Sequence, residues 1–121
     1  MCAQQHTAAL PFLALGDSYT IGEGIDTADG WPMQLVEALR AAGVVMDSPK
    51  IIAATEWTTD ELSAAIDAVE PLGHEYALVG LLIGVNNQYR GRSLNRYRTD
   101  FHRLLRTAIA FADGNSGRVF V

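Results

Sequence analysis

The feature that most constrains the fold is a repeated alternation of short apolar runs with amphipathic stretches. The apolar runs suited to strands are residues 11–15 (PFLAL), 50–53 (KIIA), 76–83 (YALVGLLI) and 118–121 (RVFV). Stretches with helical spacing separate these runs, and parallel strands need such crossover connections. The sequence therefore predicts a βαβαβαβ order, which is typical of a doubly wound α/β domain with a parallel sheet and right-handed crossovers.

Each predicted helix has a recognisable start or stop. Pro32 suits the first turn of the first helix, and Gly43 suits its end. Thr58 and Glu61 form a capping box that opens the second helix, and Ser93 caps the third. The predicted apolar stripes are Leu62, Ala65, Ile66 and Val69 in the second helix, and Leu94, Tyr97, Phe101, Leu104, Leu105 and Ile109 in the third.

Length and composition fit a single globular domain over residues 1–121. The chain has a hydrophobic fraction of 49% and a charged fraction of 19%, which excludes a disordered or fibrous protein. The apolar runs are far shorter than the roughly 20 residues of a membrane-spanning helix, so no membrane span is expected. The sequence ends inside an apolar strand, whereas a sheet of this type usually continues. We therefore expect a fold truncated after its fourth strand.

Charge is distributed unevenly along the chain. Residues 1–89 hold two cations and twelve carboxylates, whereas residues 90–121 hold seven arginines and two aspartates. Most of these arginines fall on the predicted third helix without base-stacking aromatic residues between them, so we interpret them as a solvated helix face and expect no nucleic-acid partner.

The N-terminus bears on location and on metal binding. Cys2 is the sole cysteine, which excludes an intrachain disulfide and a Cys-x-x-Cys metal site; no metal or cofactor is expected. The N-terminus has no positively charged region and no small-residue cleavage site, which favours a cytoplasmic protein. Export with a lipid anchor on Cys2 is the alternative.

Polar clusters follow the first three predicted strands, at residues 16–19, 54–57 and 84–87. In an open α/β sheet ligands bind outside the carboxyl ends of the strands, although the same residue types also favour ordinary turns. Ser18 directly follows a buried strand, where its hydroxyl could attack a carbonyl, and the Asn86 amide could donate to the resulting oxyanion. The sequence around Ser18 is not G-x-S-x-G, and the nearby glycines do not match a nucleotide-binding loop.

Three segments in this order, FLALGDSYTIGEG, TEWTTDEL and LLIGVNNQYRG, resemble blocks of the SGNH (GDSL) esterase and lipase family. The resemblance implies a flavodoxin-like, three-layer α/β/α fold and a serine esterase that cleaves small-molecule carboxylic esters without a cofactor. It assigns Ser18 as the nucleophile, and the Ser18 N–H and the Asn86 side chain as oxyanion donors.

Two departures from the family pattern accompany the resemblance. Glu56 stands where the second block has a glycine that supplies an oxyanion N–H, and a left-handed glycine conformation would suit glutamate poorly. The D-x-x-H block, which supplies the catalytic base, would lie beyond Val121. His6, His74 and His102 are each interpreted as surface or packing residues. The 121-residue stretch alone is therefore expected to have little activity.

The remaining residues near the three clusters have simpler interpretations. Asp17 is expected to bind local backbone or the helix end. The candidate pocket residues are Asp17, Tyr19, Asn87, Tyr89 and Arg90.

Two other functions stay open. One is a catalytically inert fragment or pseudoenzyme that binds or assembles through its open edge, since the unpaired last strand invites self-association. The other is a phospho-acceptor receiver domain, which ranks last because Asp17 stands alone at its strand end.

Overall fold

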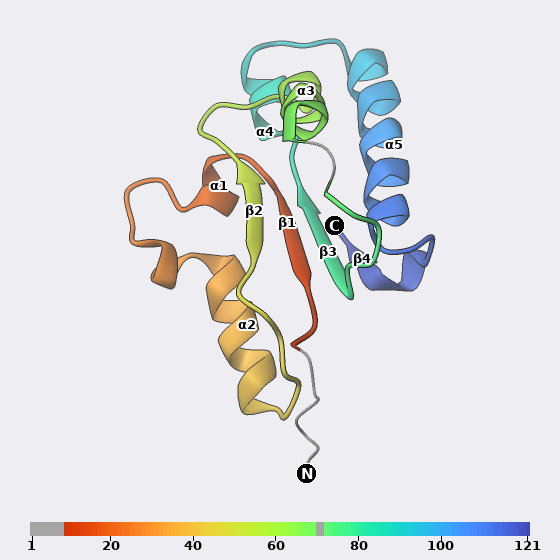
Figure 1. The fold of residues 1–121 in the computed structure, drawn as a ribbon. Helices are drawn as coiled ribbons and strands as arrows, with labels where there is room; N and C mark the ends of the chain where they lie inside the picture. Colours follow the sequence, from red (N-terminus) through yellow and green to blue (C-terminus); the bar gives the residue numbers. More distant parts are fainter. Residues whose placement is uncertain (1–8, 70–71) are drawn as a thin grey trace.

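The computed structural model describes residues 9–69 and 72–121. Its centre is a parallel four-stranded sheet in the order β2-β1-β3-β4 (Figure 1). The strands are β1 (Phe12–Gly16), β2 (Lys50–Ala53), β3 (Leu78–Leu82) and β4 (Val119–Phe120). The predicted α/β class, the parallel sheet and the central position of the third strand are thereby confirmed.

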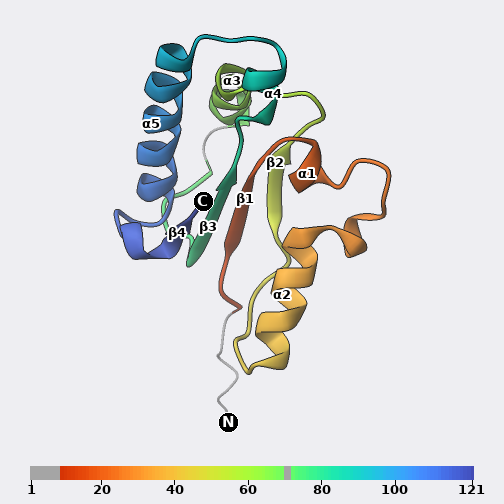
Figure 2. The ribbon, with the colours of Figure 1, turned by 180° about the vertical axis from the view of Figure 1, so that it is seen from behind.

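Helices cover both faces of this sheet. Figures 1 and 2 show α2 (Trp31–Ala41) on one side and α3 (Thr59–Val69) with α5 (Leu94–Phe111) on the other. Two short helices, α1 (Ser18–Ile21) and α4 (Val85–Tyr89), follow β1 and β3, and two 3-10 turns occupy Thr27–Asp29 and Ser116–Arg118. The arrangement is a three-layer α/β/α sandwich. Within the described residues, no helix is both long and apolar enough to cross a membrane.

Strand β1 is buried on both faces because its successive side chains point to opposite sides of the sheet. Leu13 and Leu15 are fully buried in the core that packs under α3 and α5. Phe12 and Ala14 belong to the second core, which α2 covers through Val36. A strand of this kind needs a continuous apolar run, which is what residues 11–15 provide.

Three strands differ from the prediction in their limits, the first by one residue at each end, since it spans Phe12–Gly16. The third strand spans Leu78–Leu82, because the Tyr76 N–H donates to the carbonyl of Phe111, at the end of α5, and not to a neighbouring strand. The fourth spans only Val119–Phe120, because the Asn115 side chain accepts from Gly117 N–H and caps a 3-10 turn that includes Arg118. Hydrogen bonds outside the ladder thus precede both strands, where each starts later than predicted.

The predicted apolar stripes of the second and third helices are buried or half-buried in their middle, but one terminal residue of each stripe is exposed. Ser93 caps α5 as predicted, accepting from the Arg96 N–H. Leu94, however, is 61% exposed and Val69 is 47% exposed, because each is a terminal residue of its helix. Asp100, a charged residue, is buried on α5.

Candidate functional site

The three polar segments leave the sheet at one edge. Gly16, the last residue of β1, pairs with Ala53 of β2 on one side and with Leu82 of β3 on the other. The carboxyl ends of these three neighbouring strands are thus level. Residues 17–19, 54–57 and 83–87 all begin at this edge, where α1 and α4 also lie (Figure 1).

The turn after β1 presents Ser18. Asp17 is buried and caps α1, its Oδ1 accepting from the Tyr19 N–H at 3.1 Å, as expected for a residue that binds local backbone. Burial raises the pKa of the Asp17 carboxyl. A Cβ at Gly16 would lie 2.2 Å from Thr20 Oγ1, so this tight turn requires glycine. Ser18 is half-buried, and its hydroxyl makes no hydrogen bond with the described residues.

Glu56, in the loop after β2, has a left-handed backbone with φ of 69°. Glycine adopts this region readily, whereas a residue with a Cβ is disfavoured there. The Glu56 side chain is exposed and makes no hydrogen bond or ion pair with the described residues. The strain expected for glutamate at this position is therefore present, and its own side chain does not relieve it.

Helix α4 is hydrogen-bonded to the loop that carries Glu56. Asn86 Nδ2 donates to the Trp57 carbonyl at 3.0 Å. The Asn87 amide binds Thr59 twice: its Oδ1 accepts from the backbone N–H at 3.0 Å, and its Nδ2 donates to Oγ1 at 2.9 Å. Arg90, which follows α4, donates to the Glu56 carbonyl at 2.6 Å. The segments after β2 and β3 are thus joined side by side.

The start of α3 gathers two carboxylates around Thr58. Glu61 Oε1 accepts from the Thr58 N–H at 2.9 Å, which confirms the backbone half of the predicted capping box. The Thr58 hydroxyl instead donates to Asp60 at 2.6 Å and to Glu61 at 3.0 Å. Hydrogen bonds from the Thr58 hydroxyl and from Arg92 lower the pKa of Asp60; those from the Thr58 N–H and hydroxyl and from Arg90 lower the pKa of Glu61.

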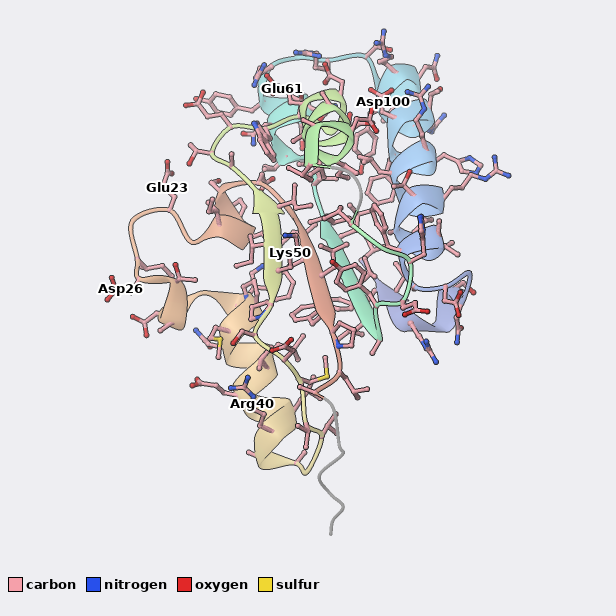
Figure 3. The ribbon with its side chains drawn as sticks, viewed as in Figure 1. Glu23, Asp26, Arg40, Lys50, Glu61 and Asp100 are labelled. Atoms are coloured by element: carbon pink, nitrogen blue, oxygen red, sulfur yellow. The ribbon has the colours of Figure 1, made fainter. Side chains whose placement is uncertain are left out.

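A chain of buried hydrogen bonds extends the contact between Asn87 and Thr59 to α5. Thr59 Oγ1 donates to Asp100 Oδ2 at 3.2 Å, and Arg96 Nε lies 3.6 Å from the same oxygen. Figure 3 shows Asp100 and Glu61 at the end of the molecule where α3, α4 and α5 meet. Aspartate is rarely buried unless it is paired, and no local sequence pattern indicates this buried contact.

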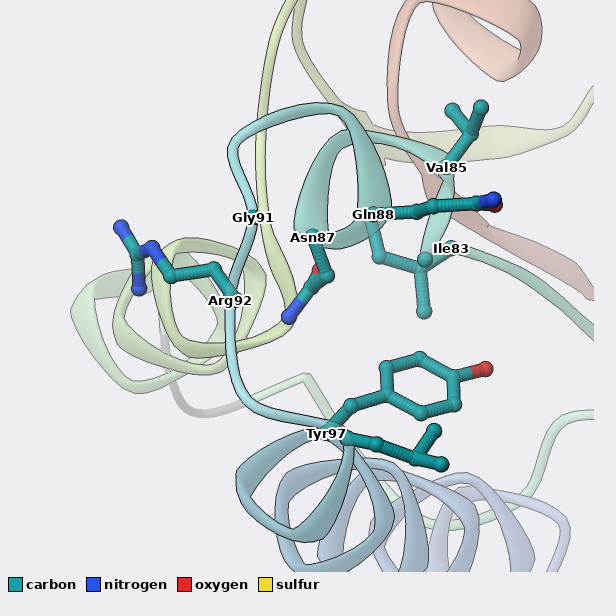
Figure 4. Close-up of a pocket in the computed structure, with 9 residues that line it drawn as sticks. Ile83, Val85, Asn87, Gln88, Gly91, Arg92 and Tyr97 are labelled. Carbon is teal, nitrogen blue, oxygen red and sulfur yellow. The ribbon is translucent and has the colours of Figure 1, made fainter.

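Two cavities flank α4. The larger, of about 590 Å³, lies between α4 and the start of α5, with Tyr97 facing Ile83 across it (Figure 4). The smaller, of about 440 Å³, is lined by Asp17 and Tyr19 and by Ile83 and Val85, which also line the larger.

The structure separates the five candidate pocket residues. Asp17 and Tyr19 line the smaller cavity, and Asn87 lines the larger. Neither cavity is lined by Arg90 or by Tyr89, which is 89% exposed.

Neither described histidine lies at this edge. His74 precedes β3, at the opposite end of the sheet, where its ring stacks on Phe111 and its Nδ1 lies 3.3 Å from the Ala110 carbonyl oxygen. His102 is exposed on α5. His6 lies outside the described residues. In the part of the chain that the structure describes, no group of three or more His, Cys, Asp or Glu residues could hold a metal ion.

Comparison with solved structures shows which fold this is. The structure is similar to AlinE4, an SGNH-hydrolase family esterase, with 27% identity, a TM-score of 0.71, and coverage of 83% of this chain and 53% of that chain. It is also similar to TesA (24% identity, TM-score 0.74, coverage 84% and 56%) and to the esterase EstA from Pseudoalteromonas sp. (20% identity, TM-score 0.70, coverage 84% and 55%). The chain therefore has the α/β fold of the SGNH hydrolases, and it spans about half the length of these proteins.

The sequence leads to the same class. The model of the GDSL-like lipase/acylhydrolase family matches residues 14–119, which is most of the chain. The chain belongs to this family. The comparison with curated proteins found no match.

Proposed function

We propose that the protein is a serine ester hydrolase in which Ser18 is the nucleophile. The observation that carries the proposal is that β2, β1 and β3 end at the same level of the sheet. The segments that contain Ser18, Glu56 and Asn86 therefore all leave the sheet at one edge. The half-buried Ser18 hydroxyl has no hydrogen-bond partner among the described residues, so it is not committed to a structural role.

In the proposed reaction, Ser18 Oγ attacks the acyl carbonyl and its proton passes to a general base. The tetrahedral intermediate then collapses to an acyl-serine ester, and the alcohol leaves with that proton. Water hydrolyses the acyl-serine ester in the second half of the reaction and restores the hydroxyl. Since the two described histidines lie elsewhere, the base would come from outside the described residues.

The oxyanion would be held by the Ser18 N–H and by Asn86. A primary amide has two N–H donors, and one on Asn86 already binds the Trp57 carbonyl. That bond fixes the amide group, and the second N–H stays available for the developing negative charge. An oxyanion donor that is fixed before the reaction needs no reorganisation when charge forms.

Hydrolysis of short p-nitrophenyl esters by the longest natural form of the protein, compared with its Ser18→Ala variant, tests the proposal. Ser18→Ala should lose activity, and Asn86→Ala should lower kcat by about 10²–10³. Asn95→Ala, on the exposed surface of α5, is the matched control for the amide loss. Equal hydrolysis by the parent and Ser18→Ala would contradict the assignment.

A non-catalytic member of the same family is the second candidate. The observation that favours it is Glu56, whose strained backbone and carboxylate stand at a position that would help to hold an oxyanion. A carboxylate there would repel the forming negative charge. The same ester assay separates the two candidates: absence of Ser18-dependent hydrolysis, in a chain that includes every family block, would favour the non-catalytic protein.

A further inference from the structure

We infer that Arg90 is a positioning residue that holds Glu56 in its left-handed conformation and thereby sets the direction of the Glu56 backbone N–H. The inference rests on the proposed function and adds the Glu56 N–H to the Ser18 N–H and Asn86 as a further oxyanion donor, because the resembling family has at this position a glycine that supplies one. Arg90 itself touches no reacting atom in this scheme. Its effect passes through the loop between β2 and α3.

The contacts of Arg90 place its guanidinium between the loop and a helix start. Nη2 lies 2.6 Å from the Glu56 carbonyl oxygen and 2.8 Å from Glu61 Oε1. Glu61 Oε1 is itself held by the N–H and the hydroxyl of Thr58. The guanidinium is therefore tied to α3 through a carboxylate that is already anchored, which limits the rotamer freedom of a long side chain.

The two peptide groups that follow Glu56 are held on both sides. In the first, the carbonyl accepts from Arg90 and the Trp57 N–H donates to the Ala54 carbonyl at 3.4 Å. In the second, the Trp57 carbonyl accepts from Asn86 and the Thr58 N–H donates to Glu61. The backbone after Glu56 is consequently fixed relative to α3 and α4.

This anchoring explains why a glutamate stays at φ of 69°. A residue with a Cβ favours negative φ, and no interaction of the Glu56 side chain with the described residues opposes that change. A return to negative φ would rotate the Thr55–Glu56 peptide against the held peptides and turn the Glu56 N–H away. Among the described residues, the Glu56 carbonyl has Arg90 as its sole hydrogen-bond donor.

NMR spectroscopy of the 121-residue chain tests the inference without any activity. A left-handed residue has a short distance between its own amide and α protons, and hence a strong intraresidue cross-peak. Arg90→Met should weaken this cross-peak at Glu56, and Arg90→Lys, which keeps a charged donor, should restore part of it. Arg92→Met is the matched control, because Arg92 makes a comparably exposed ion pair with Asp60, and its guanidinium donates to no backbone carbonyl of the described residues.

A kinetic cycle tests the same role in an active form of the protein. Arg90→Met should lower kcat about tenfold with little change in KM, which is less than the roughly 10²–10³ expected when an oxyanion donor is removed outright. In a Glu56→Gly background the same substitution should cost less, because glycine adopts positive φ without support. An equal loss in both backgrounds would contradict a role through Glu56.

The two proposals fail in different ways. Loss of the Ser18 assignment would leave the NMR result on Arg90 intact. An undiminished left-handed signature at Glu56 in Arg90→Met, with the dispersed spectrum of a folded chain, would overturn the Arg90 inference even in an active esterase.

Discussion

Replacing Glu56 by glycine should stabilise the folded protein, because the present residue has φ of 69°. A left-handed conformation costs an L-residue roughly 1–2 kcal/mol, and glycine does not incur that cost. Glycine also gives the unfolded chain more freedom, which opposes part of the gain by roughly 0.5–1 kcal/mol. The exposed Glu56 side chain makes no hydrogen bond or ion pair with the described residues, so its removal subtracts little else.

The net expectation is a gain of about 1 kcal/mol in the free energy of unfolding, equivalent to a rise in Tm of roughly 4 °C for a domain of this size. Thermal unfolding followed by circular dichroism measures this directly. Glu56→Ala removes the carboxylate and keeps the Cβ, so it should show no such rise.

Asp113 supplies a control far from the candidate site. It too has a left-handed backbone, with φ of 58°, and it follows α5. Asp113→Gly should raise Tm by less than Glu56→Gly, because aspartate visits this region more readily than glutamate. A rise for Asp113→Gly with no rise for Glu56→Gly would refute the assignment of strain to Glu56. In an active form of the protein, Glu56→Gly should also increase turnover, since it removes a negative charge near the proposed oxyanion.

Three further outcomes are expected. Asn87→Ala should lower the free energy of unfolding by about 2 kcal/mol in urea titrations, because it leaves the first N–H of α3 unpaired, whereas Asn95→Ala should have little effect. The folded-state pKa values of Asp60 and Glu61 are lowered, so these two carboxylates stabilise the fold fully above their unfolded-state pKa values near 4. This stabilisation is lost as the pH falls through their folded-state pKa values. Between about pH 6 and pH 3 the free energy of unfolding should therefore fall less steeply in Thr58→Val than in the parent protein. The outer edge of β4 is unpaired within the described residues, so light scattering should give a mass above 13.1 kDa, and a monomer at high concentration would contradict this.

Local sequence patterns were sufficient for the elements whose limits depend on local chemistry. Residues 50–53 form a strand with the predicted limits, and Pro49, which has no backbone N–H to donate, directly precedes them. Ser93 begins α5 because its hydroxyl accepts from a backbone N–H three residues later. In both places the cause lies within a few residues of the boundary.

Contacts between distant segments account for what the sequence did not predict. The helix α4 is only a few residues long and has no apolar period, and its asparagines had the same signature as ordinary turn residues. Their partners, Trp57 and Thr59, lie across the sheet edge. The burial of Asp100 likewise depends on a hydroxyl from α3. The left-handed Glu56 was foreseeable only because a resembling family has glycine there.

The exclusively parallel sheet has a consequence for how the chain reaches this structure. No strand can pair with its neighbour through a tight hairpin, and the central pair β1 and β3 joins Phe12 to Leu78, which are far apart in sequence. Such non-local pairing slows folding, because a long loop must close, at a cost in chain entropy, before the contacts that offset this cost can form. On the ribosome, the strand synthesised first must wait for β3 before both of its edges are paired. During that interval the apolar side chains of β1, which are buried in the folded protein, stay exposed, so we expect β1 to be the segment where chaperone binding matters most.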